Sequence, residues 1–209
     1  MLPFMRPSEN LTSNIRGGLI MNRKVTIILS LSYIIFMAIL VFFYKANGES
    51  FKSLVAIGGI ACGAIPLLLA LFTKLQFNLP LIISYLLFLV ASQYLGSIRG
   101  WYGLGWWDSF LHFLSGAILA FAAIALYERL VHRDAGRQIS SWFIFLFTFS
   151  FATFGGVIWE VYEFSSDQLF GMTLQGGGNR DTMIDLIADS SGGLVIAAWT
   201  GIRTRMKNR

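Results

Sequence analysis

The sequence predicts an all-α polytopic membrane protein, a bundle of about six transmembrane helices. Hydrophobic residues make up 56% of the 209 residues, and the mean hydropathy is +0.65. A soluble domain of this size could not bury the apolar surface of so many hydrophobic side chains. Six mostly apolar runs of about 20 residues are long enough to cross a hydrocarbon core of roughly 30 Å as helices, and they lack the alternation of a membrane β-barrel. The runs lie at 25–44, 54–73, 79–97, 108–127, 141–162 and 182–202.

Residues 1–20 precede the first run, and we predict that they form a disordered cytoplasmic tail. They contain two prolines and a pair of glycines and show no sustained helical period. Residues 21–209 are predicted to form a single six-helix transmembrane domain, because the connections between runs are too short to hold a second folded domain. Met21 also fits as an alternative start of the chain.

The first two runs carry no functional motif. Arg23 and Lys24 precede the first run, as in a signal peptide, but the apolar stretch is long and has no clear cleavage site, so we expect a retained helix. Cys62, in the second run, is the only cysteine and excludes an intramolecular disulfide. Pro66 is expected to kink the second helix, whereas Pro80 begins the third, where proline is well tolerated.

Lysine and arginine residues predict the orientation of the chain. With the N-terminus inside, twelve of the sixteen fall on the inner side, which are Arg6, Arg16, Arg23, Lys24, Lys74, Arg129, Arg133, Arg137, Arg203, Arg205, Lys207 and Arg209. The other four, Lys45, Lys52, Arg99 and Arg180, fall outside. The positive-inside rule therefore predicts a multi-pass protein of the inner (plasma) membrane with both termini cytoplasmic. The basic residues cluster at helix ends rather than on one face, so the pI of about 9.6 does not indicate a nucleic-acid partner.

Acidic residues gather at the predicted outer ends of the last three runs. In the stretch GWWDSFLHFLSG, Asp108 and His112 lie one helical turn apart and share a face. Three acids lie at or near the outer end of each of the fifth and sixth runs, at spacings of three or four. They are Glu160, Glu163 and Asp167, then Asp181, Asp185 and Asp189. These positions hold seven of the eleven acidic residues in the chain. Ionised groups are costly in hydrocarbon, so they are expected to face the bundle interior and to pair with something.

Simpler interpretations stand beside a functional one for several of these residues. Asp108 taken alone fits a helix N-cap, and Asp167 and Asp181 fit solvated loop acids. The only basic residues nearby, Arg99 and Arg180, are candidates to bind an anionic substrate but are too few to neutralise seven acids. The imbalance favours bound cations, carboxylates that hold their protons, or both.

The same residues resemble a known family pattern. An Asp and a His that open one helix, a WExxE-type helix end and a glycine-rich loop before DxxxDxxxD are similar to the YjdF-like family of uncharacterised bacterial inner-membrane proteins. A looser likeness extends to VanZ-like proteins, although Glu163 or Phe164 stands where a glutamine is expected and Asp189 where an asparagine is common. The resemblance covers about residues 80–200 and implies functional roles for Asp108, His112, Glu160, Glu163, Asp181, Asp185, Asp189 and Gly193.

Three classes of function fit these observations. The first is a metal-dependent protein that handles or hydrolyses a lipid phosphate or a lipid-linked envelope precursor, with Glu160 or His112 as general base. Its divalent cation would be Mg²⁺, Ca²⁺, Mn²⁺ or Zn²⁺. The expected ligands are Asp108, His112, Glu160, Glu163, Asp181, Asp185 and Asp189. The alternatives are a cation- or proton-coupled transporter and a non-catalytic membrane assembly factor. The lipid bilayer is the one partner predicted directly, and the sequence does not determine the oligomeric state.

Overall fold

The computed structural model confirms the all-α fold class. It describes residues 9–73, 77–131, 139–176 and 178–207, and within these ranges every regular element is a helix. Six of the helical segments are long and apolar enough to cross a membrane, as the six runs predict. A helix satisfies its own backbone hydrogen bonds, so such segments are stable in hydrocarbon without a partner strand.

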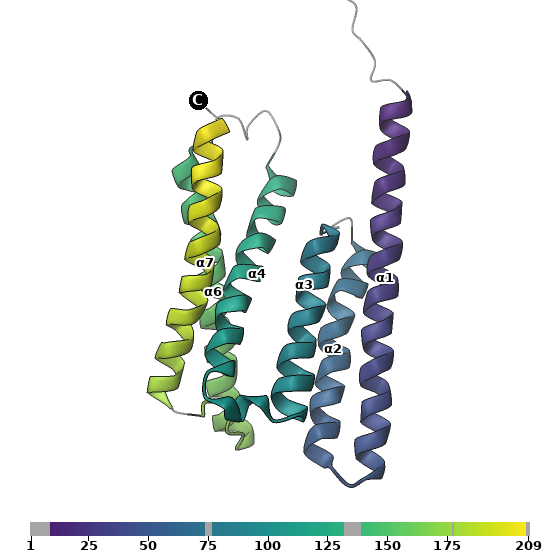
Figure 1. Cartoon of the computed structure of the whole chain (residues 1–209), viewed down its shortest axis with the longest axis vertical. Coiled ribbons are helices and arrows are strands. Elements are labelled where there is room, and N and C mark those ends of the chain that lie inside the picture. The colour runs from purple at the N-terminus through teal and green to yellow at the C-terminus, as the bar shows by residue number, and fades with distance from the viewer. Residues whose placement is uncertain (1–8, 74–76, 132–138, 177, 208–209) are drawn as a thin grey trace, which may run out of the picture. The chain divides into compact units, whose positions relative to one another are not determined.

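The chain divides into two compact units, residues 1–89 and 90–209. Unit 1 contains α1 (Glu9–Ala46), α2 (Ser50–Phe72) and α3 (Leu79–Leu89). Unit 2 contains the π-helix η1 (Val90–Ile98), the 3-10 helix η2 (Trp101–Leu104), α4 (Trp107–Leu130), α6 (Ser141–Phe170) and α7 (Asn179–Lys207) (Figure 1). That residues 21–209 act as one domain stays a prediction.

Helix α1 begins earlier than we expected. The sequence predicts a disordered tail over residues 1–20, but residues 9–20 continue the helix, and only residues 1–8 of that tail lie outside the described residues. The first candidate membrane span still begins at Asn22, next to Arg23 and Lys24. The polar residues before Asn22 therefore extend a helix that the apolar run has already nucleated, since propagation adds a hydrogen bond for each residue fixed.

In unit 1, α1 and α2 pack along stripes of small and polar residues. Gly63 lies so close to α1 that a Cβ there would be 2.4 Å from Tyr33 Cδ1. Tyr85 of α3 donates a hydrogen bond to the Cys62 carbonyl at 3.0 Å. Helix α2 continues without a break through the buried Pro66. Small residues permit this close approach between membrane helices, where packing rather than hydrophobic burial drives association.

In unit 2, the third candidate span changes from α to π geometry at Val90, which the sequence analysis does not predict. Within this π-helix, the Ala91 carbonyl accepts a 3.3 Å hydrogen bond from Trp107 Nε1. Gly100 and Gly105, both with positive φ, flank η2 and let the chain turn sharply into α4. This turn fixes the residue at which α4 begins, one position before Asp108.

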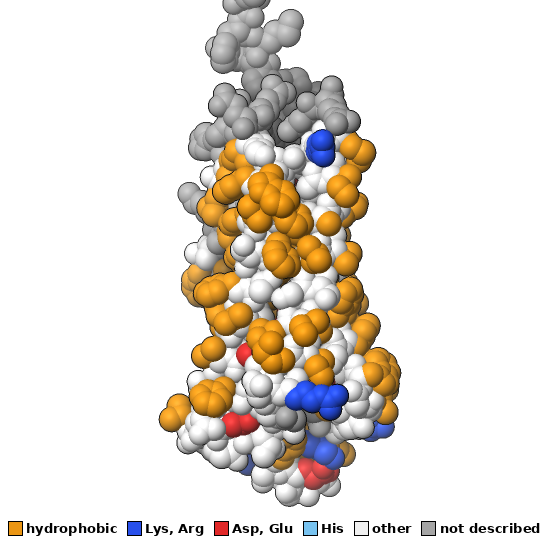
Figure 2. Space-filling view, turned by 90° about the vertical axis from the view of Figure 1, so that its left-hand side faces the viewer, with side chains coloured by type: hydrophobic (Ala, Val, Ile, Leu, Met, Phe, Trp, Pro, Cys, Tyr) orange, Lys and Arg blue, Asp and Glu red, His pale blue; other side chains and the backbone are white. Residues whose placement is uncertain are grey.

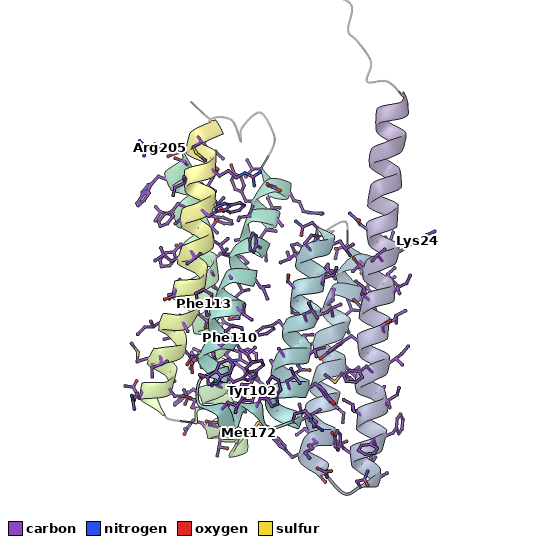
Figure 3. All side chains as sticks on the ribbon, viewed as in Figure 1. Lys24, Tyr102, Phe110, Phe113, Met172 and Arg205 are labelled. Carbon is purple, nitrogen blue, oxygen red and sulfur yellow. The ribbon has the colours of Figure 1, made fainter. Side chains whose placement is uncertain are left out.

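Helices α4, α6 and α7 pack against one another along their length. We name the acidic end of unit 2 as the end where α4 begins, α6 ends and α7 begins. Tyr102, Phe110 and Met172 lie toward this end, and Arg205 lies at the opposite one (Figure 3). The side of the molecule shown in Figure 2 is largely apolar along its length, with acidic side chains only toward one end. An apolar exterior of this kind suits a lipid environment.

Candidate functional site

The site is built around His112, which lies on α4 one turn after Asp108. The ring is buried, with 6% of the residue exposed, although it is a polar side chain in a membrane helix. Glu160 on α6 is 5% exposed, and Asp185 and Asp189 on α7 are 2% and 1% exposed. We call these five residues the His112 cluster: Asp108, His112, Glu160, Asp185 and Asp189.

Three carboxylate oxygens lie around one ring nitrogen, His112 Nε2. Their distances from Nε2 are 3.8 Å for Asp108 Oδ1, 3.9 Å for Asp185 Oδ2 and 4.0 Å for Glu160 Oε1. These distances exceed the hydrogen-bond range of about 2.7–3.2 Å. The distances from Nε2 to Asp108 and Asp185 do fit ligands of one cation, because two atoms bound to the same ion at about 2.0–2.2 Å lie up to roughly 4 Å apart. Ligand atoms of Asp108, His112 and Asp185 all lie within 4.8 Å of one another.

The other ring nitrogen has a different partner. His112 Nδ1 is 2.9 Å from Asp189 Oδ2, which is a direct hydrogen bond. The second oxygen of this carboxylate, Oδ1, accepts a hydrogen bond from Ser115, whose hydroxyl also lies 2.8 Å from the His112 carbonyl oxygen. Both oxygens of Asp189 are therefore engaged within α4 and α7.

Glu160 has one oxygen with no such partner. Its Oε1 is buried and accepts no hydrogen bond, although it lies toward His112 Nε2. The Thr182 side chain lies beside the carboxylate, and Gln175 Nε2 donates a hydrogen bond to Thr182 Oγ1 at 2.8 Å. A buried polar atom without a partner is unusual and costs about 1–3 kcal/mol, so a ligand at this position would remove a real penalty.

Glycines bring the helices close together next to the cluster, about one turn further from the acidic end. A Cβ at Gly116 would lie 2.0 Å from the Asp189 carbonyl oxygen, and one at Gly192 would lie 2.0 Å from the Phe113 carbonyl oxygen. A Cβ at Gly156 would lie 2.7 Å from Asp189 Oδ2. The backbones of α4 and α7 therefore meet next to Asp189, and Gly156 of α6 lies against its side chain. Asp108, whose side chain is 38% exposed, is the member of the cluster nearest to the acidic end.

A hydrogen-bonded loop and a rim of aromatic residues lie at the acidic end. Asp167, near the end of α6, accepts hydrogen bonds from the backbone N–H groups of Leu174 at 2.7 Å and Gln175 at 3.0 Å. Trp101 and Trp107 form an edge-to-face pair with ring centroids 4.9 Å apart. Burial raises the pKa of Tyr102 to about 12, so its hydroxyl is a neutral hydrogen-bonding group at the rim.

Not every residue that the sequence singles out joins the cluster. Glu163 accepts a 2.8 Å hydrogen bond from Trp159 Nε1 at the rim, and Asp181 is half-buried at the start of α7. Arg99 and Arg180 are both exposed, and in the described part of the chain no ion pair joins either of them to a carboxylate. The proposed substrate-binding role of the two arginines stays a prediction.

Three hydroxyl residues in the site were not expected from the sequence. Ser115 contacts Asp189, Thr182 contacts Glu160, and Ser109 Oγ is 3.5 Å from Asp185 Oδ1. Sequence spacing could have predicted two of them, because Ser115 and Ser109 each lie three positions from His112 and so fall near its face of α4. Thr182 carries no comparable signal, since its contact depends on how α6 and α7 are rotated.

The charge balance of the cluster defines its chemistry. Four carboxylates surround one imidazole, and among the described residues no lysine or arginine pairs with them. Carboxylates in this environment require protons or a cation to offset their desolvation. An imidazole nitrogen with carboxylate oxygens is also a set that binds divalent metals and activates water.

Comparison with known proteins agrees with the resemblance found in the sequence. A family model described as "Predicted membrane protein (DUF2238)" matches residues 28–206, which covers all six candidate spans except the first residues of one. No curated protein and no solved structure matches the chain. The matched region includes every residue of the His112 cluster. The chain therefore belongs to the DUF2238 family of predicted membrane proteins, which is the YjdF-like family.

Proposed function

We propose that this protein binds a divalent cation in the His112 cluster and uses it to handle or hydrolyse a lipid phosphate or a lipid-linked envelope precursor at the extracytoplasmic face. The observation that carries the proposal is that ligand atoms of Asp108, His112 and Asp185 all lie within 4.8 Å of one another, with two carboxylate oxygens 3.8 and 3.9 Å from the imidazole nitrogen. Such spacing is too long for hydrogen bonds and fits ligands that share an ion.

The position of the cluster supports a lipid substrate. The cluster lies at the acidic end, where tryptophans gather as they do at the level of lipid headgroups. A phosphate ester at that level can place its oxygens on a cation while its acyl chains stay in the bilayer. Mg²⁺, Ca²⁺, Mn²⁺ and Zn²⁺ all accept carboxylate ligands and polarise phosphoryl oxygens.

Glu160 is the proposed general base. Its buried Oε1 has no hydrogen-bond partner, and Glu160 is not part of the group of close ligand atoms formed by Asp108, His112 and Asp185, so its carboxylate is available to accept a proton from water. In hydrolysis, the oxygen of a water molecule would form the new bond to phosphorus while the bond from phosphorus to the lipid oxygen breaks. Glu160 would accept the proton from water and return it to the lipid alkoxide, so charge and atoms balance.

Transport of a cation across the membrane is the rival function. It would need a path from the cluster toward the opposite end of unit 2. The contacts at Gly116, Gly156 and Gly192 close the layer that such a path would have to cross. We therefore favour chemistry at one face over conduction.

The test uses the full chain purified in detergent, with Glu160→Gln as the site variant and Glu128→Gln as the control. Glu128 is an exposed acid near the other end of α4. We expect bound metal in the wild type and in the control. Phosphate release from phosphatidic acid in mixed micelles should stop with EDTA and return with added cation. Glu160→Gln should reduce it by about 10²–10⁴-fold.

Two results would reject the proposal. If the wild-type protein binds none of the four cations, there is no cation site and the proposal is wrong. Cation flux into liposomes that depends on Glu160, without phosphate release, would favour the transporter.

A further inference from the structure

The two nitrogens of His112 are placed in unequal surroundings. Nδ1 is hydrogen-bonded to Asp189 at 2.9 Å, and Asp189 is only 1% exposed. A carboxylate can only accept a hydrogen bond from this nitrogen, so the ring proton resides on Nδ1. The lone pair of the neutral ring is then on Nε2.

That lone pair faces the three other carboxylates of the cluster. With the ring neutral and these carboxylates ionised, Nε2 and the oxygens of Asp108, Asp185 and Glu160 present only lone pairs to one another, and a cation between them would offset the repulsion. The orphaned, buried Oε1 of Glu160 is an independent sign of a missing partner at the same point. Both observations indicate a positive ion beside Nε2.

We propose that His112 Nε2 is a direct ligand of a divalent transition ion of the zinc or manganese type, and that Asp189 is a positioning residue that orients the imidazole rather than a ligand. This inference rests on the cation site of the proposed function and narrows the ion that it takes. Mg²⁺ and Ca²⁺ prefer all-oxygen sites, whereas imidazole nitrogen favours transition ions.

Packing holds Asp189 to this role. Ser115 binds its Oδ1, while Gly116 and Gly156 press against its backbone and side chain from α4 and α6. The carboxylate is therefore fixed on Nδ1 and cannot readily turn toward the ion. Metal-binding histidines commonly donate their second N–H to such a carboxylate, and its loss typically weakens metal affinity by about 10–100-fold.

The first experiment measures zinc affinity by equilibrium dialysis of the purified full chain, with manganese and magnesium as competitors. Wild type should retain zinc against a large excess of magnesium. His112→Ala should lose tight zinc binding. Asp189→Asn should still bind one ion, about 10–100-fold more weakly. Glu128→Gln should match the wild type.

The second experiment distinguishes positioning from a general structural role. The visible absorption bands of bound Co²⁺ report its direct ligands, so Asp189→Asn should keep the band pattern and Asp185→Asn should change it. In a His112→Ala background, Asp189→Asn should not weaken residual manganese binding further, because its effect acts through the imidazole.

Several results would overturn the inference. One is that magnesium displaces zinc from the wild type at equal concentration. Another is that Asp189→Asn alters the Co²⁺ spectrum. The third is that Asp189→Asn leaves the zinc affinity unchanged. If Asp189→Asn does not fold, Ser115→Ala replaces it, and zinc affinity unchanged in that variant would also overturn the inference. These readouts need no enzymatic activity. Zinc binding without phosphate release would reject the proposed function alone, and release supported by magnesium without zinc binding would reject this inference alone.

Discussion

At His112, one side chain links all three helices of the acidic end. Its Nδ1 contacts α7 through Asp189, and its Nε2 faces α4, α6 and α7 through three carboxylates. Removing any one member changes the field around the others, because groups that share one ion or one desolvated site act together. Effects of substitution in this cluster should therefore not add.

We predict that Glu160→Gln, Asp185→Asn and His112→Ala each reduce lipid phosphate hydrolysis by at least about 100-fold. Combining them should cost little more than one substitution, since ligands and base of one site act as a unit. The substitutions at Glu160 and Asp185 are near-isosteric, so expression and helix content by circular dichroism should stay near the wild-type values.

An assembly role for the cluster makes a different prediction for the same variants. Neutralising a buried acid can remove desolvation cost and stabilise the fold. Full activity together with a higher melting temperature in Glu160→Gln and Asp185→Asn would mean that the carboxylates serve packing alone.

At the scale of helices, glycine contacts decide how close α4 and α7 lie. Gly116 faces the Asp189 backbone and Gly192 faces the Phe113 backbone, and neither neighbour can move aside as a flexible side chain would. The position of His112 relative to Asp189 therefore depends on the absence of two methyl groups.

We predict that Gly116→Ala and Gly192→Ala each destabilise the protein by about 1–3 kcal/mol, because overpacking forces the backbones apart. Gly58→Ala is the matched control, since Gly58 lies within α2 and a Cβ there meets nothing within 4 Å. The control should be neutral or more stable by up to about 1 kcal/mol. Thermal unfolding in detergent measures both, and equal melting temperatures for all three variants would contradict the packing argument.

For the whole molecule, orientation in the membrane decides which compartment the cluster faces. In unit 2, the residues that end α4 and α7 include Arg129, Arg203 and Arg205, opposite the acidic end. We predict that reporter fusions at residue 175 are extracytoplasmic and those at residue 135, outside the described residues, are cytoplasmic. The reverse pattern would place the cluster in the cytoplasm and exclude an envelope substrate.

A second prediction at this scale concerns the N-terminus. Deleting residues 1–20 should leave membrane insertion, melting temperature and activity unchanged, because the first candidate span begins at Asn22 and loses no apolar residue. Expression level and thermal unfolding of the truncated chain check this. A clear loss of either would show that the helical residues from Glu9 onward contribute to folding.

Hydropathy along the chain was enough to predict six spans, because a helix in lipid depends on local apolar length. Helical periodicity was enough to predict which acids share a face with one another. Two features of the fold escaped this reasoning. They are the π-helical turn from Val90 and the helical start at Glu9, since both depend on small local energies rather than on hydropathy.

By itself the sequence determined the fold class, the family pattern and the acids available at one end of three helices. Only the tertiary structure decided which atoms meet: Asp189 on His112 Nδ1, three carboxylates around Nε2, and Glu163 on Trp159 instead. Periodicity gives the face of each helix but not its rotation or its distance from a neighbour. Those are set by close contacts at Gly116, Gly156 and Gly192, which join residues that lie far apart along the chain.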